Sequence, residues 1–558
     1  MSDAAALKRP KTPAGGRAAG ARDRVTKRVV LADPLSVEGI EVLRAAESLE
    51  VIDASQKGRE ALLETLGDAA GLIVRSGTRV DAELLDAAAG LEVIGRAGVG
   101  VDNIDMEAAT RRGVAVVNAP GGNTRSTAEL AFALLLAAAR RVAEADRSVR
   151  AGRWERKALR GRQLYGNTLG VIGAGRIGAE VARRAHAFGM RVLAYDPYLS
   201  AERAADEHLE AVELDELLER SDFVTLHVPL TDQTRGLIGF SELARLKPTA
   251  VLINAARGGI VDEEALAVAL EQGKLAGAAL DVYGTEPLSE DHPLRRAPNL
   301  VLTPHLGAAT LEAQREVALE IAGAVRDALV AGDLTAALNV PQVDPEERAQ
   351  FEPLLELGRR LGVVLSALTD GRCRRLEVRY AGSMSRVTRL LSAAALEGYL
   401  RSTVASPLNL VNALAVADER SIDVARVHSR RIADYANYVE LAATGGPREQ
   451  VVGGALLEEG HRRLTRIGRF HVDIMPRGNL VLVKNRDVPG VIGEVGSCLG
   501  RAEVNIAEYH LARTEAGGEA LGVIRTDVPL PRDLIDDLSG LPSVLEVRQV
   551  ILDPPPGA

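Results

Sequence analysis

Three charged residues, each just after an apolar run, could together oxidise a hydroxyl group. They are Arg257 in NAARGGIVD, Glu286 in DVYGTEP and His305 in LTPHLGAAT. Hydride transfer from a 2-hydroxy acid needs a base for the hydroxyl proton and a cation for the carboxylate. Histidine suits the first task, because a neighbouring carboxylate can raise its pKa from the ordinary value of about 6.5. Singly, the three could be a core histidine, a turn acid and a structural ion-pair partner, but their joint occurrence favours the chemistry.

A glycine-rich turn could hold a dinucleotide. Gly173, Gly175 and Gly178 form G-x-G-x-x-G directly after the apolar run LGVI and directly before the helical segment GAEVARRAHAF, with Arg176 and Ile177 inside the turn. The first glycine permits a tight turn, the second lets the backbone approach a pyrophosphate, and the third allows close helix packing. The start of the helix also offers unpaired N–H groups to the anion. In this context the motif predicts a dinucleotide site.

An acidic residue follows the next apolar run. Asp196 comes after RVLAY, at the distance where a carboxylate accepts hydrogen bonds from the adenine ribose hydroxyls. A carboxylate there would repel a 2′-phosphate, which favours NAD over NADP. The alternative, a glycine-rich turn with a solvent-facing aspartate, would not require strand, glycines, helix and acid in this order.

Short apolar runs alternate with helix-like segments in two series, one from Arg28 to about Pro120 and one from Thr168 to His305. This rhythm predicts two doubly wound, Rossmann-like α/β domains with buried parallel sheets. An apolar helix, 128–139, joins the two series, and a helix-like stretch, 312–331, follows the second. We therefore expect the nucleotide domain to be inserted into the substrate domain.

The remainder of the chain differs in pattern. The segment LNVPQVDPEER, 338–348, combines prolines and charges and resembles a linker. From Asn479 the pattern reads strand, turn, helix, strand, strand, helix, strand, which predicts a small ferredoxin-type α/β sandwich. The expected domains are a disordered tail at 1–24, a substrate-binding domain at 25–127 and 309–340, an NAD-binding domain at 128–308, an α+β intervening domain at 341–476, and a regulatory domain at 477–558.

Composition limits the class of protein. The chain has 558 residues, 26% charged and 46% hydrophobic, with a net charge of −9, so it has no global attraction to nucleic acid. No apolar run is long enough for a bilayer span. The two cysteines, Cys373 and Cys498, lack metal-ligand spacing, so we expect no metal and a reducing cytoplasm. The basic N-terminal tail could instead be a transit peptide or a nucleic-acid-binding arm.

Between about residues 28 and 340 the chain resembles the D-2-hydroxyacid dehydrogenase family, through the motifs around Arg257, Glu286 and His305. The resemblance implies an NAD-dependent enzyme in which His305 is the acid/base and Glu286 orients it and raises its pKa. It implies that Arg257 binds the substrate carboxylate and polarises the C2 oxygen. Asp281, in ALDVY, would contact the nicotinamide carboxamide.

Arginines near strand ends suggest a phosphorylated substrate, since arginine offers phosphate a planar fork of donors. The phrases resemble those of phosphoglycerate dehydrogenases, which implies 3-phosphoglycerate as substrate and, for the WERK arginine, a reach into a neighbouring subunit's active site. The residues are Arg75, Ser76 and Gly77 in VRSGT, Arg96 and Asn103 in GRAGVGVDNID, and Arg156 in GRWERKALRG. Each arginine alone could be a solvated surface charge.

The C-terminal phrases NRDVPGVIG and VNIAEYH resemble an ACT domain, a module that binds amino acids at subunit interfaces. This implies L-serine as an effector, held by Asn485, Asp487 and Asn505, in a homo-oligomer that is a dimer or tetramer. Alternatively, the module only builds the oligomer. A basic run from His461 to His471 in the intervening region could bind a second anion or form a solvated face.

Two other functions stay open at this level. A glyoxylate or hydroxypyruvate reductase of the same family would share the chemistry but would normally end near residue 340. An NAD(H)-sensing corepressor scaffold would keep the fold and the charged triplet but would lack an ACT-like C-terminus. The leading prediction is oxidation of 3-phosphoglycerate to 3-phosphohydroxypyruvate, the first step of phosphorylated serine biosynthesis.

Overall fold

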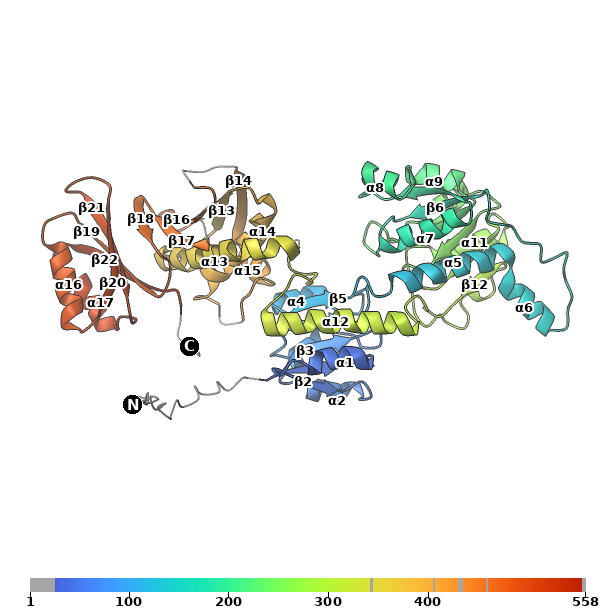
Figure 1. Ribbon diagram of the computed structural model, residues 1–558, viewed down its shortest axis with the longest axis horizontal. Coiled ribbons are helices and arrows are strands. Elements are labelled where there is room, and N and C mark those ends of the chain that lie inside the picture. Colours follow the sequence, from blue (N-terminus) through green and yellow to red (C-terminus); the bar gives the residue numbers. More distant parts are fainter. Residues whose placement is uncertain (1–25, 342–344, 405–406, 430–434, 458–459, 554–558) are drawn as a thin grey trace, which may run out of the picture.

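The computed structural model describes residues 26–341, 345–404, 407–429, 435–457 and 460–553. These residues form four sheets. In Figure 1 the first sheet, in blue, lies between the nucleotide-binding lobe in cyan and green and the C-terminal lobes in orange and red. The predicted N-terminal tail, 1–24, lies outside the described residues.

The first sheet is parallel throughout, in the order β2-β1-β3-β4-β5. Alternate residues of its strands face opposite ways, and both faces are apolar. One face packs against α1 and the long α12, the other against α2, α3 and α4. The elements are β1 Lys27–Leu31, α1 Val37–Arg44, β2 Leu49–Asp53, α2 Arg59–Thr65, β3 Ala69–Val74, α3 Ala82–Ala87, β4 Val93–Arg96, α4 Met106–Arg111, β5 Ala115–Asn118 and α12 Leu311–Ala331.

The second sheet is also parallel, in the order β12-β11-β10-β9-β6-β7-β8. The strand order reverses between β6 and β9, and ligands of open α/β sheets bind at such a switch point, beyond the carboxyl ends of the strands. Its elements are α5 Thr124–Arg140, α6 Val142–Arg150, β6 Thr168–Ile172, α7 Arg176–Ala187, β7 Arg191–Tyr195, α8 Ala201–Asp206, β8 Glu210–Ala211, α9 Leu214–Arg220, β9 Phe223–Leu226, α10 Phe240–Arg245, β10 Val251–Asn254, α11 Glu263–Glu271, β11 Gly277–Leu280, η1 Pro293–Arg295 and β12 Leu300–Leu302.

The chain returns to the first sheet after β12. Helix α12 lies beside α1 and across β4 and β5, and Gly95 of β4 makes room for it, because a Cβ there would press on Val325 and Ile321. The next residues line the open edge of β5: Ala337 bridges Val117, and the N–H of Leu338 donates to Val116 O at 2.7 Å. The insertion of one α/β domain into the other is therefore as predicted.

The third sheet is mixed, in the order β14-β13-β15-β16-β17-β18, with the tightly paired helices α13 and α14 packed on it. The segment predicted as a linker is only partly one: Leu338 lies along β5, and α13 already begins at Pro345, a residue that suits a helix start because its φ is preset. The elements are α13 Pro345–Leu368, β13 Arg375–Ala381, η2 Ser385–Val387, α14 Thr388–Leu400, α15 Ala413–Glu419, β14 Asp423–Ser429, β15 Tyr438–Thr444, β16 Gln450–Leu456, β17 Arg462–Ile467 and β18 Phe470–Ile474.

The fourth sheet has the predicted ferredoxin-type connectivity and is antiparallel, in the order β20-β21-β19-β22. Helices α16 and α17 cover one face (Figure 1), and the other packs toward α13 and β18. Its elements are β19 Asn479–Arg486, α16 Val491–Arg501, β20 Ile506–Arg513, β21 Glu519–Thr526, α17 Arg532–Ser539 and β22 Val544–Ile551. None of the described helices in the molecule combines the length and apolarity needed for a membrane span.

Candidate active site

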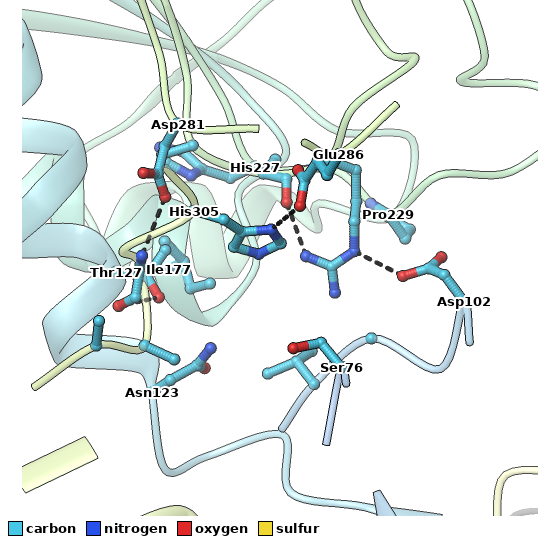
Figure 2. Close-up of a pocket in the computed structure, with 18 of the residues that line it drawn as sticks. Ser76, Asp102, Asn123, Thr127, Ile177, His227, Pro229, Asp281, Glu286 and His305 are labelled. Carbon is cyan, nitrogen blue, oxygen red and sulfur yellow. Dashed lines mark hydrogen bonds and ion pairs between the residues drawn. The ribbon is translucent and has the colours of Figure 1, made fainter. Parts of the chain in front are cut away.

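A cavity of about 480 Å³ lies between the first two sheets, at the carboxyl ends of their strands (Figure 2). His305 and Glu286 lie on its wall, and His305 Nδ1 is 2.7 Å from Glu286 Oε2. The other carboxylate oxygen of Glu286 accepts a hydrogen bond from the N–H of Tyr283 at 3.1 Å. With Nδ1 committed to the carboxylate, Nε2 is the imidazole nitrogen left to exchange a proton with a ligand.

The loop that carries His305 is fixed by Asp281, a fully buried carboxylate just after β11. Its Oδ1 accepts from the N–H of Leu306 at 2.8 Å and from the hydroxyl of Thr303 at 2.7 Å, and its Oδ2 accepts from the N–H of Gly307 at 3.0 Å. These bonds hold His305 at φ 56°, a left-handed conformation that is costly for a residue with a Cβ. Asp281 also lines the cavity. Its contact with a nicotinamide stays a prediction.

Arg257 follows β10 and points its guanidinium into the same cavity. Its Nη1 donates to Ala256 O at 2.7 Å, and its Nε donates to Asp102 Oδ2 at 3.2 Å. Asp102 belongs to the loop after β4, so this ion pair joins the two domains across the cleft (Figure 2). Sequence reasoning missed Asp102, although it lies two residues after Gly100 in GRAGVGVDNID.

Two further arginines, Arg75 and Arg96, bring positive charge to the substrate-domain wall of the cavity. Arg96 lies across Gly98, where a Cβ would overlap its guanidinium. Among the described residues, its Nη1 donates to Ala97 O, and its Nε is buried without a hydrogen-bond partner. Burial, with the nearby charge of Arg257 second, lowers the pKa of Arg96 to about 10. A desolvated guanidinium with an unused donor is well suited to bind an anion.

Of the predicted substrate residues near Arg75, some line the cavity and others support the loop behind it. Ser76 lines the cavity, while Gly77 does not and instead lies against Asp33, whose Oδ2 accepts from the N–H of Arg75 at 2.6 Å. The Asn103 amide donates to Arg75 O at 2.7 Å and to Thr78 O at 2.6 Å. Asn103 therefore braces the loop that carries Arg75 and Ser76, and direct contact of Asn103 with substrate stays a prediction.

The glycine-rich turn fits a dinucleotide. Gly173 has φ 94°, Gly175 faces open space, and a Cβ on Gly178 would overlap Gly173 O. Each glycine thus has the property that its place in the motif demands. Asp196 stands at the end of β7 with Oδ2 accepting from the N–H of Ala174 in this turn at 2.9 Å.

Beside the glycine-rich turn, α7 begins with Arg176, which is exposed, followed by Ile177, which lines the cavity. His227, just after β9, was missed by sequence reasoning, although it follows the strand in DFVTLHVP. It lines the cavity, its Nε2 lies 2.9 Å from Thr225 Oγ1, and its Nδ1 is buried without a partner. Burial lowers the pKa of His227 to about 4.

Arg156, like Gly77 and Asn103, does not line the cavity of its own chain. It is exposed, in the irregular segment between α6 and β6, which extends away from the body of the nucleotide domain (Figure 1). A role at the active site therefore requires the cavity of another chain.

The predicted effector residues are likewise not brought together within one chain. Asn485 is buried near the end of β19 and pairs in register with Ala520. Asp487 follows it and accepts from the N–H of Gly517 at 3.0 Å. Asn505 precedes β20 at the opposite end of the sheet and donates to Asp527 Oδ2 at 2.7 Å. Ile506, next to Asn505, pairs with Thr526, and Thr526 pairs with Asn479 at the start of β19. Asn485 lies six residues further along β19, a distance of about 20 Å.

The predicted second anion site also proves only partly free. In the run from His461 to His471, Arg463 pairs with Asp473, Arg466 with Glu440, and Arg469 with Glu519. Most of this charge is thus already compensated within the described residues, which supports the structural alternative.

Comparisons with known proteins agree with this architecture. Residues 132–307 match a family model described as the NAD-binding domain of D-isomer specific 2-hydroxyacid dehydrogenases, and residues 350–468 match the D-3-phosphoglycerate dehydrogenase intervening domain. The D-3-phosphoglycerate dehydrogenase of Archaeoglobus fulgidus is 41% identical over 528 residues, 94% of this chain and 100% of the relative. That of Bacillus subtilis is 38% identical over 530 residues, 94% of this chain and 99% of the relative.

The chain belongs to the D-3-phosphoglycerate dehydrogenase family. It is therefore an NAD-dependent D-2-hydroxyacid dehydrogenase, as the glycine-rich turn and the His305–Glu286 pair predicted. Among solved structures, the TT0316 protein from Thermus thermophilus is 41% identical with a TM-score of 0.50, and covers 55% of this chain and 97% of its own. A glyoxylate reductase from Paecilomyes thermophila is 34% identical with a TM-score of 0.52, and covers 58% of this chain and 99% of its own. Both match little more than half of this chain, whereas the phosphoglycerate dehydrogenases match nearly all of it.

Proposed function

We propose that the chain oxidises 3-phosphoglycerate to 3-phosphohydroxypyruvate with NAD⁺, the first step of the phosphorylated route to L-serine, in the cavity between its first two domains. The observation that carries this proposal is the 2.7 Å pair of His305 and Glu286, facing the same cavity as Arg257, Arg75 and Arg96. The His305–Glu286 pair can accept and return a proton. The three arginines can bind a substrate that carries a negative group at each end.

His305 is the acid/base. Oxidation removes a hydride from C2 and a proton from the C2 hydroxyl, and this proton passes to Nε2 of His305. The resulting imidazolium is stabilised by Glu286, whose carboxylate is held at Nδ1. Arg257 binds the substrate carboxylate through its open edge and polarises the C2 oxygen, while Arg75, Arg96 and Ser76 receive the remote phosphate.

NAD⁺, when bound, supplies the hydride acceptor. The turn of Gly173, Gly175 and Gly178 would hold its pyrophosphate, and Asp196 would accept hydrogen bonds from its adenine ribose hydroxyls. Its charge disfavours a 2′-phosphate at that position. Ile177 and Asp281, which line the cavity together with His305, would hold the nicotinamide there.

L-Serine is the proposed effector, and its site is formed between two copies of the chain. Asn485 and Asp487 from one copy meet Asn505 of another, which reconciles their separation within a single sheet. The same requirement for a second copy applies to Arg156, so the enzyme is proposed to be a homo-oligomer.

The test is an assay of NAD⁺ reduction with 3-phosphoglycerate, D-glycerate and D-lactate as substrates, with and without L-serine. The proposal expects kcat/KM for 3-phosphoglycerate to exceed that for D-glycerate by at least about tenfold, since a charge-assisted phosphate contact contributes roughly 1.5–3 kcal/mol. Equal values for the two would favour a glyoxylate or hydroxypyruvate reductase. NADH binding without turnover of any hydroxy acid would favour a sensing scaffold.

A further inference from the structure

We propose that Asp102 is a positioning residue for Arg257, holding its guanidinium from across the cleft in the orientation that receives the substrate carboxylate. This inference rests on the proposed function, since it concerns the same site. It assigns to Asp102, an acidic residue in a cavity for an anionic substrate, a role that its charge alone would not suggest.

The donor pattern of Arg257 carries the argument. Nη1 is committed to Ala256 O and Nε to Asp102 Oδ2, whereas Nη2 makes no hydrogen bond to any described residue. The guanidinium is planar with its donors in a fixed fork, so holding two nitrogens fixes the direction of the third. Without Asp102, the group keeps one anchor and can turn about it. Asp102 thereby selects which edge of Arg257 faces the ligand.

The local backbone is shaped to permit this pair. At Gly100 a Cβ would overlap Nη2 of Arg257 and would lie 2.7 Å from Asp102 Oδ2. Only glycine leaves space there for both partners to meet. Gly98, two residues earlier, likewise leaves space for Arg96, because a Cβ there would overlap its guanidinium.

The Asp102–Arg257 pair also makes the orientation of the Arg257 guanidinium depend on the alignment of the two domains. Asp102 is carried by the loop after β4 of the first sheet, and Arg257 by the loop after β10 of the second. The hydrogen bond can form only when these two strand ends face each other across the cavity. Arg257 is therefore ready for a carboxylate only in the aligned arrangement.

If Asp102 positions Arg257, its loss should change the kinetics of the enzyme but not its stability. The Asp102 side chain is 61% exposed, and an ion pair so open to water contributes little to stability. Removal of the pair should therefore leave the melting temperature and NADH affinity unchanged. Misorientation of a substrate-binding cation, in contrast, directly lowers turnover or substrate affinity.

The experiment compares Asp102→Ala with Asp102→Asn in the full chain. Asparagine keeps an oxygen that can accept from Nε, whereas alanine removes it. We expect Asp102→Ala to lower kcat/KM for 3-phosphoglycerate by about 10- to 100-fold, and Asp102→Asn to recover most of that loss. Glu107→Ala is the matched control, because Glu107 lies on the same stretch of chain but pairs with Arg111 on the exposed face of α4.

Wild-type kinetics in Asp102→Ala, or equal losses in both variants, would overturn the proposal. A lower melting temperature or weaker NADH binding in Asp102→Ala would assign Asp102 to the scaffold instead and would overturn it as well. A second readout is independent of turnover: oxalate binding to the NADH complex should weaken in Asp102→Ala and not in Asp102→Asn. If the wild-type chain proves inactive on 3-phosphoglycerate, the proposed function fails, and the oxalate titration still decides the role of Asp102.

Discussion

The cavity between the first two domains and the C-terminal sheet use their functional residues in opposite ways. In the cavity, Arg257, Asp281 and His305 follow three neighbouring parallel strands, so their loops meet at one edge of the sheet. In the C-terminal sheet the strands are antiparallel, so Asn485 and Asn505 lie at opposite ends. Parallel topology assembles a site within one chain, whereas the antiparallel module needs a second chain to bring its residues together.

The largest expected effect tests the one-chain site. His305→Asn should lower kcat by about 10²–10⁴-fold, because it removes the proton acceptor. NADH binding should remain, since the residues of the glycine-rich turn are untouched. Steady-state kinetics and NADH fluorescence titration measure the two effects. Turnover above a tenth of wild type would remove His305 from its assigned role and weaken the view that one chain holds the full chemistry.

A complementation experiment tests whether Arg156 acts in the cavity of a neighbouring chain. Arg156→Ala and His305→Asn chains are each expected to be poorly active alone, but their unfolded mixture should regain activity on refolding. If dimers form at random, roughly a quarter of the cavities then combine an intact His305 with an intact Arg156 from the neighbour. No gain over the separate variants would mean that Arg156 does not complete a neighbouring cavity.

Serine inhibition provides the matching test for the C-terminal sheet. Asn505→Ala should weaken serine inhibition by about 5–150-fold without loss of uninhibited activity, the range expected for an allosteric coupling of roughly 1–3 kcal/mol. Dose–response curves with the Asp473→Asn variant as a control would measure it, because Asp473 pairs with Arg463 and with none of the three effector residues. Unchanged sensitivity to serine in Asn505→Ala would contradict the proposed effector site.

The smallest expected effect is on the pH dependence of stability, through His227 in the cavity. The pKa of His227 falls from about 6.5 in the unfolded chain to about 4 in the fold, so the unfolded state binds more protons between these values. Stability from the neutral imidazole is thus present above pH 6.5 and is lost as pH falls toward 4, by at most about 3 kcal/mol. His227→Gln should therefore show a shallower fall in melting temperature between pH 7 and pH 5.

The control for this prediction is His471→Gln, at an exposed histidine of β18. This variant should follow the wild-type pH dependence. Parallel curves for the wild type and His227→Gln would show that His227 does not titrate as its buried position implies.

The placement of a side chain could be predicted from the sequence where a residue type and a strand end coincide. The glycines of the turn, Glu286 and His305 each follow an apolar run, and the structure brings them to the same edge of the nucleotide-domain sheet. Asp102 was missed because its partner, Arg257, lies in another domain and no local pattern links the two. The amide nitrogen of Asn103, in the same loop, donates to two backbone carbonyls, a bracing role that spacing alone does not reveal.

The short stretch that runs along β5 after α12 has a consequence for how such enzymes can be extended. Asn339 accepts from the N–H of Val116 and donates to Val114 O, so the catalytic half closes its own sheet before the next domain begins. A chain cut after Val340 would carry no open β5 edge, whereas a cut before Ala337 would expose one to aggregation. Position 340 is therefore a point at which another module can be joined without opening the sheet of the catalytic half.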